Sequence, residues 1–129
     1  MRQSANIWIV DDDEDVRFGL CSFLRSAGCV VRTFNSAEAC LGALDDSAPD
    51  LLLTDLHMPG MDGLALQEHL NGLRRQFPVM VMTAFPTGEA EQRSIGLGAC
   101  VFLTKPIDPE QLLAQVQGSL GGCDESKPD

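Results

Sequence analysis

Five short runs of mainly apolar residues divide the chain, and each of them ends at or just before a polar residue. Short runs bounded by turn residues are typical of strands in a parallel sheet that helices cover on both faces. One run opens with three consecutive leucines, so we expect that strand to be buried on both of its faces. The predicted strands span residues 7–10, 30–34, 51–55, 79–83 and 101–104.

Most segments between these runs carry apolar residues at helical spacing. Asn35 and Glu38 resemble a capping box at the start of one helix, Asp62 begins another, and Asp108 caps the last. The segment 88–97 has few large apolar residues, so we expect it to be among the least rigid elements. The predicted helices span residues 16–27, 35–44, 62–73, 88–97 and 109–120.

This regular alternation of strand and helix, with short connections, determines the predicted fold class. It predicts an α/β fold, a doubly wound five-stranded parallel sheet with five helices. The sequence indicates one domain over residues 5–118, followed by a polar tail or linker over residues 119–129. No apolar run approaches the length needed to span a bilayer.

The acidic composition of the chain limits its partners. The formal net charge is −10, from 19 acidic and 9 basic residues. Phosphate backbones and anionic lipids repel such a chain, so we expect this domain to bind neither nucleic acid nor membrane. The five cysteines form no CxxC pair, which disfavours a zinc site or a disulfide framework. We therefore expect reduced thiols, four of them in the core, and a cytoplasmic location.

The ends of four predicted strands carry polar groups of unusual kind: Asp11 and Asp12, then Asp55, Thr83 and Lys105. The carboxyl ends of parallel strands share one edge of the sheet, where sites form in α/β folds. Three carboxylates crowded there repel one another unless a cation shares the site. Ligation by oxygen atoms from few carboxylates suits Mg²⁺, which keeps several waters and favours phosphate oxygens.

A carboxylate beside Mg²⁺ can act as a nucleophile on phosphorus and form an aspartyl phosphate. The transferred phosphoryl group spreads negative charge over three oxygens, which a metal ion, an ammonium and a hydroxyl would neutralise. Lys105 and Thr83 are of the right chemical type for two of these partners. The strand-end residues therefore indicate Mg²⁺-dependent phosphoryl transfer onto a carboxylate.

Four motifs of this chain resemble the receiver domain of two-component response regulators. They are Ile9–Asp13, Asp55–Gly63, Met82–Ala84 and Gly98–Pro106. The motifs occur in the order and at the spacing of that family, and the resemblance covers residues from about 5 to 118. It implies the flavodoxin-like strand order 2-1-3-4-5 and a phosphoacceptor signalling domain rather than an enzyme.

The resemblance implies a role for each strand-end residue. Asp55 would accept a phosphoryl group from a histidine kinase or a phosphotransfer protein. Asp12 and Asp55 would ligate Mg²⁺ directly, together with the backbone carbonyl of His57, whereas Asp11 would act through water. Lys105, whose bond to the following proline is expected to be cis, would pair with the phosphoryl group.

The resemblance also implies a switch. Thr83 would move towards the phosphoryl oxygens and vacate space into which Phe102 rotates. Phe102 stands where many family members have tyrosine, so it can respond by burial but offers no hydroxyl. His57 and Phe85 stand two residues beyond Asp55 and Thr83, and we expect them to tune the lifetime of the aspartyl phosphate.

Other classes of protein share parts of this pattern. A metal-dependent phosphatase of the haloacid-dehalogenase type needs a second aspartate where this chain has His57. A pseudo-receiver that serves only as a docking module would be expected to lack part of the pocket, and every pocket residue is present. The alternating acids of residues 11–15 resemble an EF-hand loop, but Val16 and Ser22 replace its glycine and glutamate.

The turn after Asp55 and the residues before Lys105 resemble those of receivers that are joined to helix-turn-helix domains. The expected output follows from this analogy. We therefore expect control of transcription. Phosphorylation would reorganise the helix at 88–97, the strand at 101–104 and the last helix into a surface for a homodimer or another partner.

Overall fold

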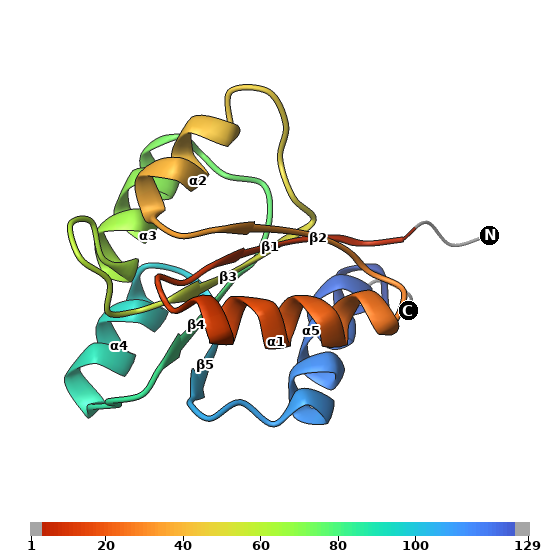
Figure 1. Ribbon diagram of the computed structural model, residues 1–129. Helices are drawn as coiled ribbons and strands as arrows, with labels where there is room; N and C mark the ends of the chain where they lie inside the picture. Colours follow the sequence, from red (N-terminus) through yellow and green to blue (C-terminus); the bar gives the residue numbers. More distant parts are fainter. Residues whose placement is uncertain (1–3, 126–129) are drawn as a thin grey trace.

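The computed structural model describes residues 4–125, and within them five parallel strands form one sheet in the order β2-β1-β3-β4-β5 (Figure 1). The strands are β1 (Asn6–Val10), β2 (Val30–Phe34), β3 (Leu51–Asp55), β4 (Val79–Thr83) and β5 (Ala99–Thr104). The helices are α1 (Glu14–Ser26), α2 (Ala37–Ala43), α3 (Gly63–Gly72), α4 (Gly88–Gly96) and α5 (Pro109–Glu125). The fold class and strand order predicted from the sequence are confirmed.

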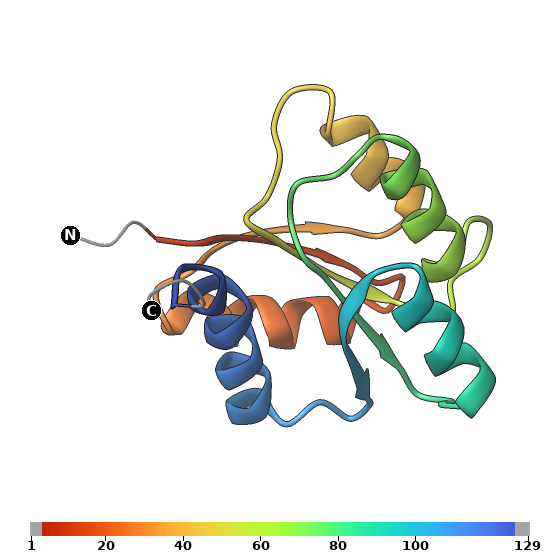
Figure 2. The same ribbon diagram turned by 180° about the vertical axis from the view of Figure 1, so that it is seen from behind.

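Helices cover both faces of the sheet: α1 and α5 lie on one face, and α2, α3 and α4 on the other (Figures 1 and 2). Successive side chains of a strand point to opposite faces, so each strand supplies both cores. Ile7 and Ile9 of β1 pack towards α1 and α5, whereas Trp8 and Val10 pack on the other side. Every residue of β3 is buried, as its leucine run predicts.

Two helix starts differ from the sequence prediction. Helix α1 begins at Glu14 instead of residue 16, because the Asp13 carboxylate accepts hydrogen bonds from the amides of Asp15 and Val16. The capping box assigned to Asn35 and Glu38 is wrong: Ser36 caps α2. Glu38 instead accepts a hydrogen bond from the Met61 amide, with Oε2 and N 3.3 Å apart. A side chain that bonds a distant loop leaves no local signal in the sequence.

Two helix ends also differ from expectation. Leu66 and Leu70 of α3 are buried as their spacing predicts, but Leu73 is the C-cap residue and is 63% exposed. Helix α5 continues to Glu125, through residues that the sequence assigned to a polar tail. The remaining tail, 126–129, lies outside the described residues.

The cysteines are less buried than the sequence suggested. Among the cysteines whose side chains the structure describes, only Cys40 is buried, while Cys21 and Cys29 are half-buried and Cys100 is exposed. Cys40 therefore lies in the core and Cys21 and Cys29 pack against it, whereas Cys100 does not. The side chain of Cys123 lies outside the described residues, so the expectation of four core thiols stays a prediction. Within the described residues, no helix combines the length and the apolar content needed to cross a membrane.

Candidate functional site and metal centre

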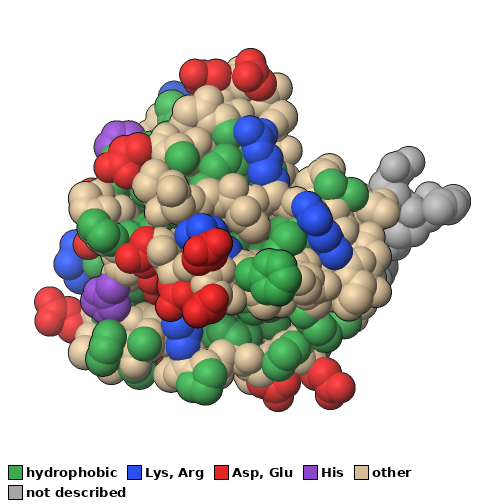
Figure 3. Space-filling view, viewed as in Figure 1, with side chains coloured by type: hydrophobic (Ala, Val, Ile, Leu, Met, Phe, Trp, Pro, Cys, Tyr) green, Lys and Arg blue, Asp and Glu red, His purple; other side chains and the backbone are tan. Residues whose placement is uncertain are grey.

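Three carboxylates meet at the carboxyl edge of the sheet. Asp11 and Asp12 directly follow β1, Asp55 ends β3, and these two strands are paired neighbours. One carboxylate oxygen from each residue lies within 4.8 Å of the others. Asp11 and Asp55 are buried, whereas Asp12 is exposed. Figure 3 shows acidic side chains gathered over the start of α1.

Lys105, the residue directly after β5, joins this cluster. Its Nζ lies 2.8 Å from Asp11 Oδ2 and 3.3 Å from Asp55 Oδ1. Its backbone amide donates to the carbonyl oxygen of Thr83 at 2.8 Å, which ties the end of β5 to the end of β4. The Lys105–Pro106 peptide bond is cis, as expected. The described residues thus place the Lys105 ammonium between two of the three carboxylates, those of Asp11 and Asp55.

Negative charge exceeds positive charge in this cluster, and the pKa values of Asp55 and Lys105 are both raised. Burial and then the neighbouring Asp11 carboxylate raise the pKa of Asp55, and Lys105 only partly opposes them. Burial alone would lower the pKa of Lys105, but its contacts with Asp11 and Asp55 outweigh burial and raise that pKa. Ionised Asp55 therefore needs more positive charge than Lys105 supplies.

The donor set fits a hard divalent cation. All the candidate ligands are carboxylate oxygens, which suit Mg²⁺. Both Asp11 oxygens already have partners, since Oδ1 accepts from the Asp13 amide at 2.9 Å and Oδ2 pairs with Lys105. Asp12 is exposed at the rim of the cluster, so its carboxylate can turn towards an ion from solvent.

Thr83 lies beside Asp55 because β3 and β4 are paired. Asp55 is opposite Met82, and Thr83 is the next residue of β4. Thr83 is fully buried, and its Oγ1 accepts a hydrogen bond from the Phe85 amide at 3.0 Å. His57 is exposed, and its ring meets Phe85 edge-on with centroids 6.2 Å apart. Phe85 is 74% exposed, so the pair stands at the rim of the site.

Two glycines shape the loop between β3 and α3. Gly60 has φ of 75°, in the left-handed region that favours glycine. At Gly63, a Cβ atom would lie 2.6 Å from the Asp55 carbonyl oxygen and 2.9 Å from the Leu56 Cα. Only glycine therefore lets the first residue of α3 pack against the end of β3. The Pro-Gly-Met-Asp-Gly turn holds Asp55 in place through this contact.

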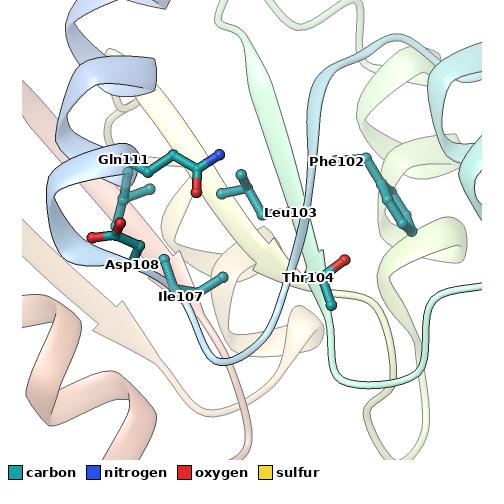
Figure 4. A pocket seen from close by; sticks show the side chains of 7 residues that line it. Phe102, Leu103, Thr104, Ile107, Asp108 and Gln111 are labelled. Carbon is teal, nitrogen blue, oxygen red and sulfur yellow. The ribbon is translucent and has the colours of Figure 1, made fainter.

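Phe102 lies away from the carboxylates, on β5. It is partly buried against the core beneath α2, α3 and α4. Figure 4 shows its ring on the opposite side of β5 from Leu103 and Ile107. All three residues line a cavity of about 240 Å³ beside the start of α5. Phe102 pairs in register with Val81, two residues before Thr83. The described contacts place Phe102 near the end of β4 but not in the acidic cluster.

The sequence profile of the response regulator receiver domain matches residues 7–117. The chain belongs to this receiver family. Its Asp11, Asp12, Asp55, Thr83 and Lys105 occupy one edge of the sheet, as the geometry above shows. Relatives and solved structures of the same family agree with this assignment.

Similar proteins include transcription regulators. The chain is 36% identical over 125 residues to the DNA-binding transcriptional regulator NtrC of Salmonella typhimurium, which covers 97% of this chain and 27% of NtrC. It is 32% identical over 120 residues to the transcriptional regulatory protein FixJ of Bradyrhizobium diazoefficiens, covering 93% of this chain and 58% of FixJ. The chain thus spans only part of the length of these relatives.

The fold is that of solved receiver structures. A CheY-like receiver domain protein from Methanospirillum hungatei superposes with a TM-score of 0.90 at 26% identity, covering 96% of this chain and 99% of that one. The solved FixJ N-terminal domain gives a TM-score of 0.85 at 31% identity, with coverage of 92% and 95%.

One residue at the site escaped the sequence prediction. Arg17 of α1 donates from Nη1 to the carbonyl oxygen of Asp11 at 2.7 Å. Arginines on the polar side of a surface helix are common, so nothing in the local pattern distinguishes this one. The only signal is its separation of six residues from Asp11, which lets a side chain of the first turns of α1 reach back to the loop before the helix.

Proposed function

We propose that Asp55 accepts a phosphoryl group from a histidine kinase or a phosphotransfer protein. The observation that carries the proposal is the environment of this carboxylate. It is 5% exposed, lies 3.3 Å from the Lys105 ammonium, and has an oxygen within 4.8 Å of carboxylate oxygens of Asp11 and Asp12. A strand-end carboxylate with a cation and further metal ligands beside it meets the requirements for phosphoryl transfer.

In the transfer step, a carboxylate oxygen of Asp55 attacks the phosphorus of a phosphohistidine. The new O–P bond forms as the P–N bond breaks, and the imidazole nitrogen leaves with the electron pair. Asp12, Asp55 and the His57 carbonyl would hold Mg²⁺, with Asp11 acting through water. Once bound, Mg²⁺ neutralises charge on the phosphoryl oxygens.

Two side chains of the protein complete the stabilisation of the phosphoryl group. Lys105 pairs with a phosphoryl oxygen, and it is already held at the site by its contacts with Asp11 and Asp55. The Thr83 hydroxyl accepts from the Phe85 amide and keeps its own proton to donate to another phosphoryl oxygen. Exchange of the ion-pair partners of Lys105 and movement of Thr83 are the local events that phosphorylation produces.

The signal would leave the site through Thr83 and Phe102. Movement of Thr83 at the end of β4 makes room for Phe102, which lies in register two residues back along the paired strands. The surface formed by α4, β5 and α5 would then change and bind a second copy of the domain or another partner. The relatives named as transcription regulators support transcription as the output. The proposed location is the cytoplasm, which reduced thiols without any CxxC pair favour.

The rim residues His57 and Phe85 would set the lifetime of the aspartyl phosphate. Their rings meet edge-on, and we expect the pair to cover the side of the site from which water approaches. Replacement of His57 by alanine opens that side, so hydrolysis is expected to change rate. Equal lifetimes for wild type and His57→Ala would remove this role.

Phosphoryl uptake from acetyl phosphate tests the proposed function. We expect wild type with Mg²⁺ to gain the mass of one phosphoryl group, and EDTA or Asp55→Asn to abolish the gain. Glu14→Gln is the matched control, since it removes an exposed acid near the cluster and should leave uptake intact. No uptake by wild type would indicate a docking module, and equal uptake by Asp55→Asn would rule out this acceptor.

A further inference from the structure

Arg17 connects α1 to the loop that carries two of the three carboxylates. Its Nη1 donates to the carbonyl oxygen of Asp11 at 2.7 Å, a short and charge-assisted hydrogen bond. The Arg17 side chain is half-buried, so water competes for this bond only partly. This hydrogen bond of the guanidinium goes to the backbone and not to a carboxylate, which indicates that Arg17 fixes the conformation of the loop after β1.

The carbonyl that Arg17 holds belongs to the peptide bond between Asp11 and Asp12. A peptide unit is planar, so fixing its oxygen also fixes the position of the Asp12 Cα. The Asp11 side chain is independently held, by Lys105 on one oxygen and the Asp13 amide on the other. Asp12 is exposed and its side chain can rotate, so the position of its Cα decides which points its carboxylate can reach.

We propose that Arg17 is a positioning residue for the divalent cation. It holds the peptide unit between Asp11 and Asp12 in the orientation that turns the Asp12 carboxylate towards Asp55. The inference rests on the proposed function, in which Asp12 ligates Mg²⁺. Arg17 touches neither the cation nor the phosphoryl group, and it acts through Asp12 alone.

Isothermal titration calorimetry with Mg²⁺ alone tests the role without phosphoryl transfer. Arg17→Met removes the donor but keeps an unbranched apolar stem that packs as the arginine stem does. We expect Mg²⁺ to bind about tenfold more weakly, the smaller loss typical when a group that orients a metal ligand is removed. Arg17→Lys keeps the charge and a donor, so it should recover most of the affinity.

The same helix offers a matched control. Arg25 donates from Nη2 to the carbonyl oxygen of Val31 at 3.3 Å, far along α1 from the acidic loop. Arg25→Met removes an equivalent contact between α1 and the backbone. Its Mg²⁺ affinity should equal that of wild type, even if both methionine variants lose some resistance to urea.

A second readout needs no metal. The Asp13 amide donates to Asp11 Oδ1, so its hydrogen exchange reports on the loop. In metal-free protein, Arg17→Met should speed exchange at the Asp13 amide and leave the amides of β1 unchanged. A purely structural role would instead speed exchange throughout the domain and equally in Arg25→Met.

The outcomes separate the two proposals. If wild type binds Mg²⁺ and Arg17→Met binds it equally well, or if Arg25→Met weakens binding as much, Arg17 has no positioning role while the proposed function stands. If wild type binds no Mg²⁺, the proposed function fails, and the role of Arg17 fails with it.

Discussion

Helices α1 and α4 both flank the acidic edge of the sheet, but different forces hold them in place. Helix α1 buries Leu20 and Leu24 against the sheet, and Arg17 ties it to the loop after β1. Among the nine residues of α4, all of which the structure describes, Ser94 is the only buried one. Apolar packing therefore anchors α1, the helix next to the loop that carries Asp11 and Asp12, whereas α4 depends on polar contacts.

The polar contacts of α4 gather at its C-terminal end. Two residues of α3 and one just beyond it, spaced four apart, each donate a side-chain N–H to a carbonyl oxygen at that end. They are Gln67, Asn71 and Arg75. The acceptors are Ser94, Leu97 and Gly98, at 3.0, 2.8 and 3.1 Å. The Ser94 hydroxyl in turn donates to Gln67 Oε1 at 3.1 Å, and both residues are fully buried.

This difference indicates which side of the site can move. Buried leucines resist displacement because exposing them costs hydrophobic free energy, so the loop that holds Asp11 and Asp12 has a fixed support. The N-terminal end of α4 follows Phe85 and lies away from the polar contacts with α3. We therefore expect α4 to move about its C-terminal end when Thr83 rearranges.

The largest predicted effect is in the packing of α1. Leu24 is fully buried, so Leu24→Ala should lower the free energy of unfolding by about 2–5 kcal/mol. Ile95→Ala is the control on α4: Ile95 is 46% exposed, and the loss should stay below about 0.5 kcal/mol. Urea titration followed by the fluorescence of Trp8, the single tryptophan, measures both. Equal losses would mean that the two helices are anchored alike.

Breaking the contact between α3 and α4 should have the next largest effect. Gln67→Leu leaves the buried Ser94 hydroxyl and carbonyl without their partner, so we expect a loss of about 1–3 kcal/mol. Adding Ser94→Ala removes the orphaned hydroxyl and should restore part of the stability. A double-mutant cycle by urea unfolding measures this coupling. Strictly additive losses would show that the two side chains do not act together.

The helix caps allow a smaller and more closely matched comparison. Asp13 caps α1 and Thr87 caps α4, each through its side-chain oxygen. Asp13→Ala should lower global stability by about 1 kcal/mol. Thr87→Ala should mainly speed amide exchange within α4, because we expect that helix to open locally before the domain unfolds. A global loss of similar size in both variants would contradict the comparison.

The smallest expected change is a gain in the free energy of unfolding, in the variant Asp55→Asn. Burial and the Asp11 carboxylate raise the pKa of Asp55 above its unfolded value, so its contribution to stability is complete below the unfolded pKa and is lost as pH rises through the folded pKa. Asp55→Asn should therefore be more stable than wild type at neutral pH in EDTA. The difference should shrink as the solution is acidified through the pKa of Asp55. A less stable variant at neutral pH would contradict this.

The sequence predicted the sheet well because each strand is a bounded apolar run, as β3 with its leucines illustrates. It also indicated the residues that meet at the carboxyl edge, because parallel strands bring their ends together. It failed where a partner lies far along the chain. Glu38 bonds the loop at Met61 rather than its own helix, and Gln67 bonds Ser94, 27 residues away. Neither contact leaves a periodic pattern.

The most direct test of the central claim is the free energy of unfolding measured against Mg²⁺ concentration at constant ionic strength. If Asp11, Asp12 and Asp55 form a cation site, Mg²⁺ binds only the folded state and should stabilise wild type progressively once its concentration exceeds the dissociation constant. Asp12→Asn should flatten that dependence. A wild type that Mg²⁺ does not stabilise, or an Asp12→Asn variant stabilised as strongly as wild type, would contradict the account.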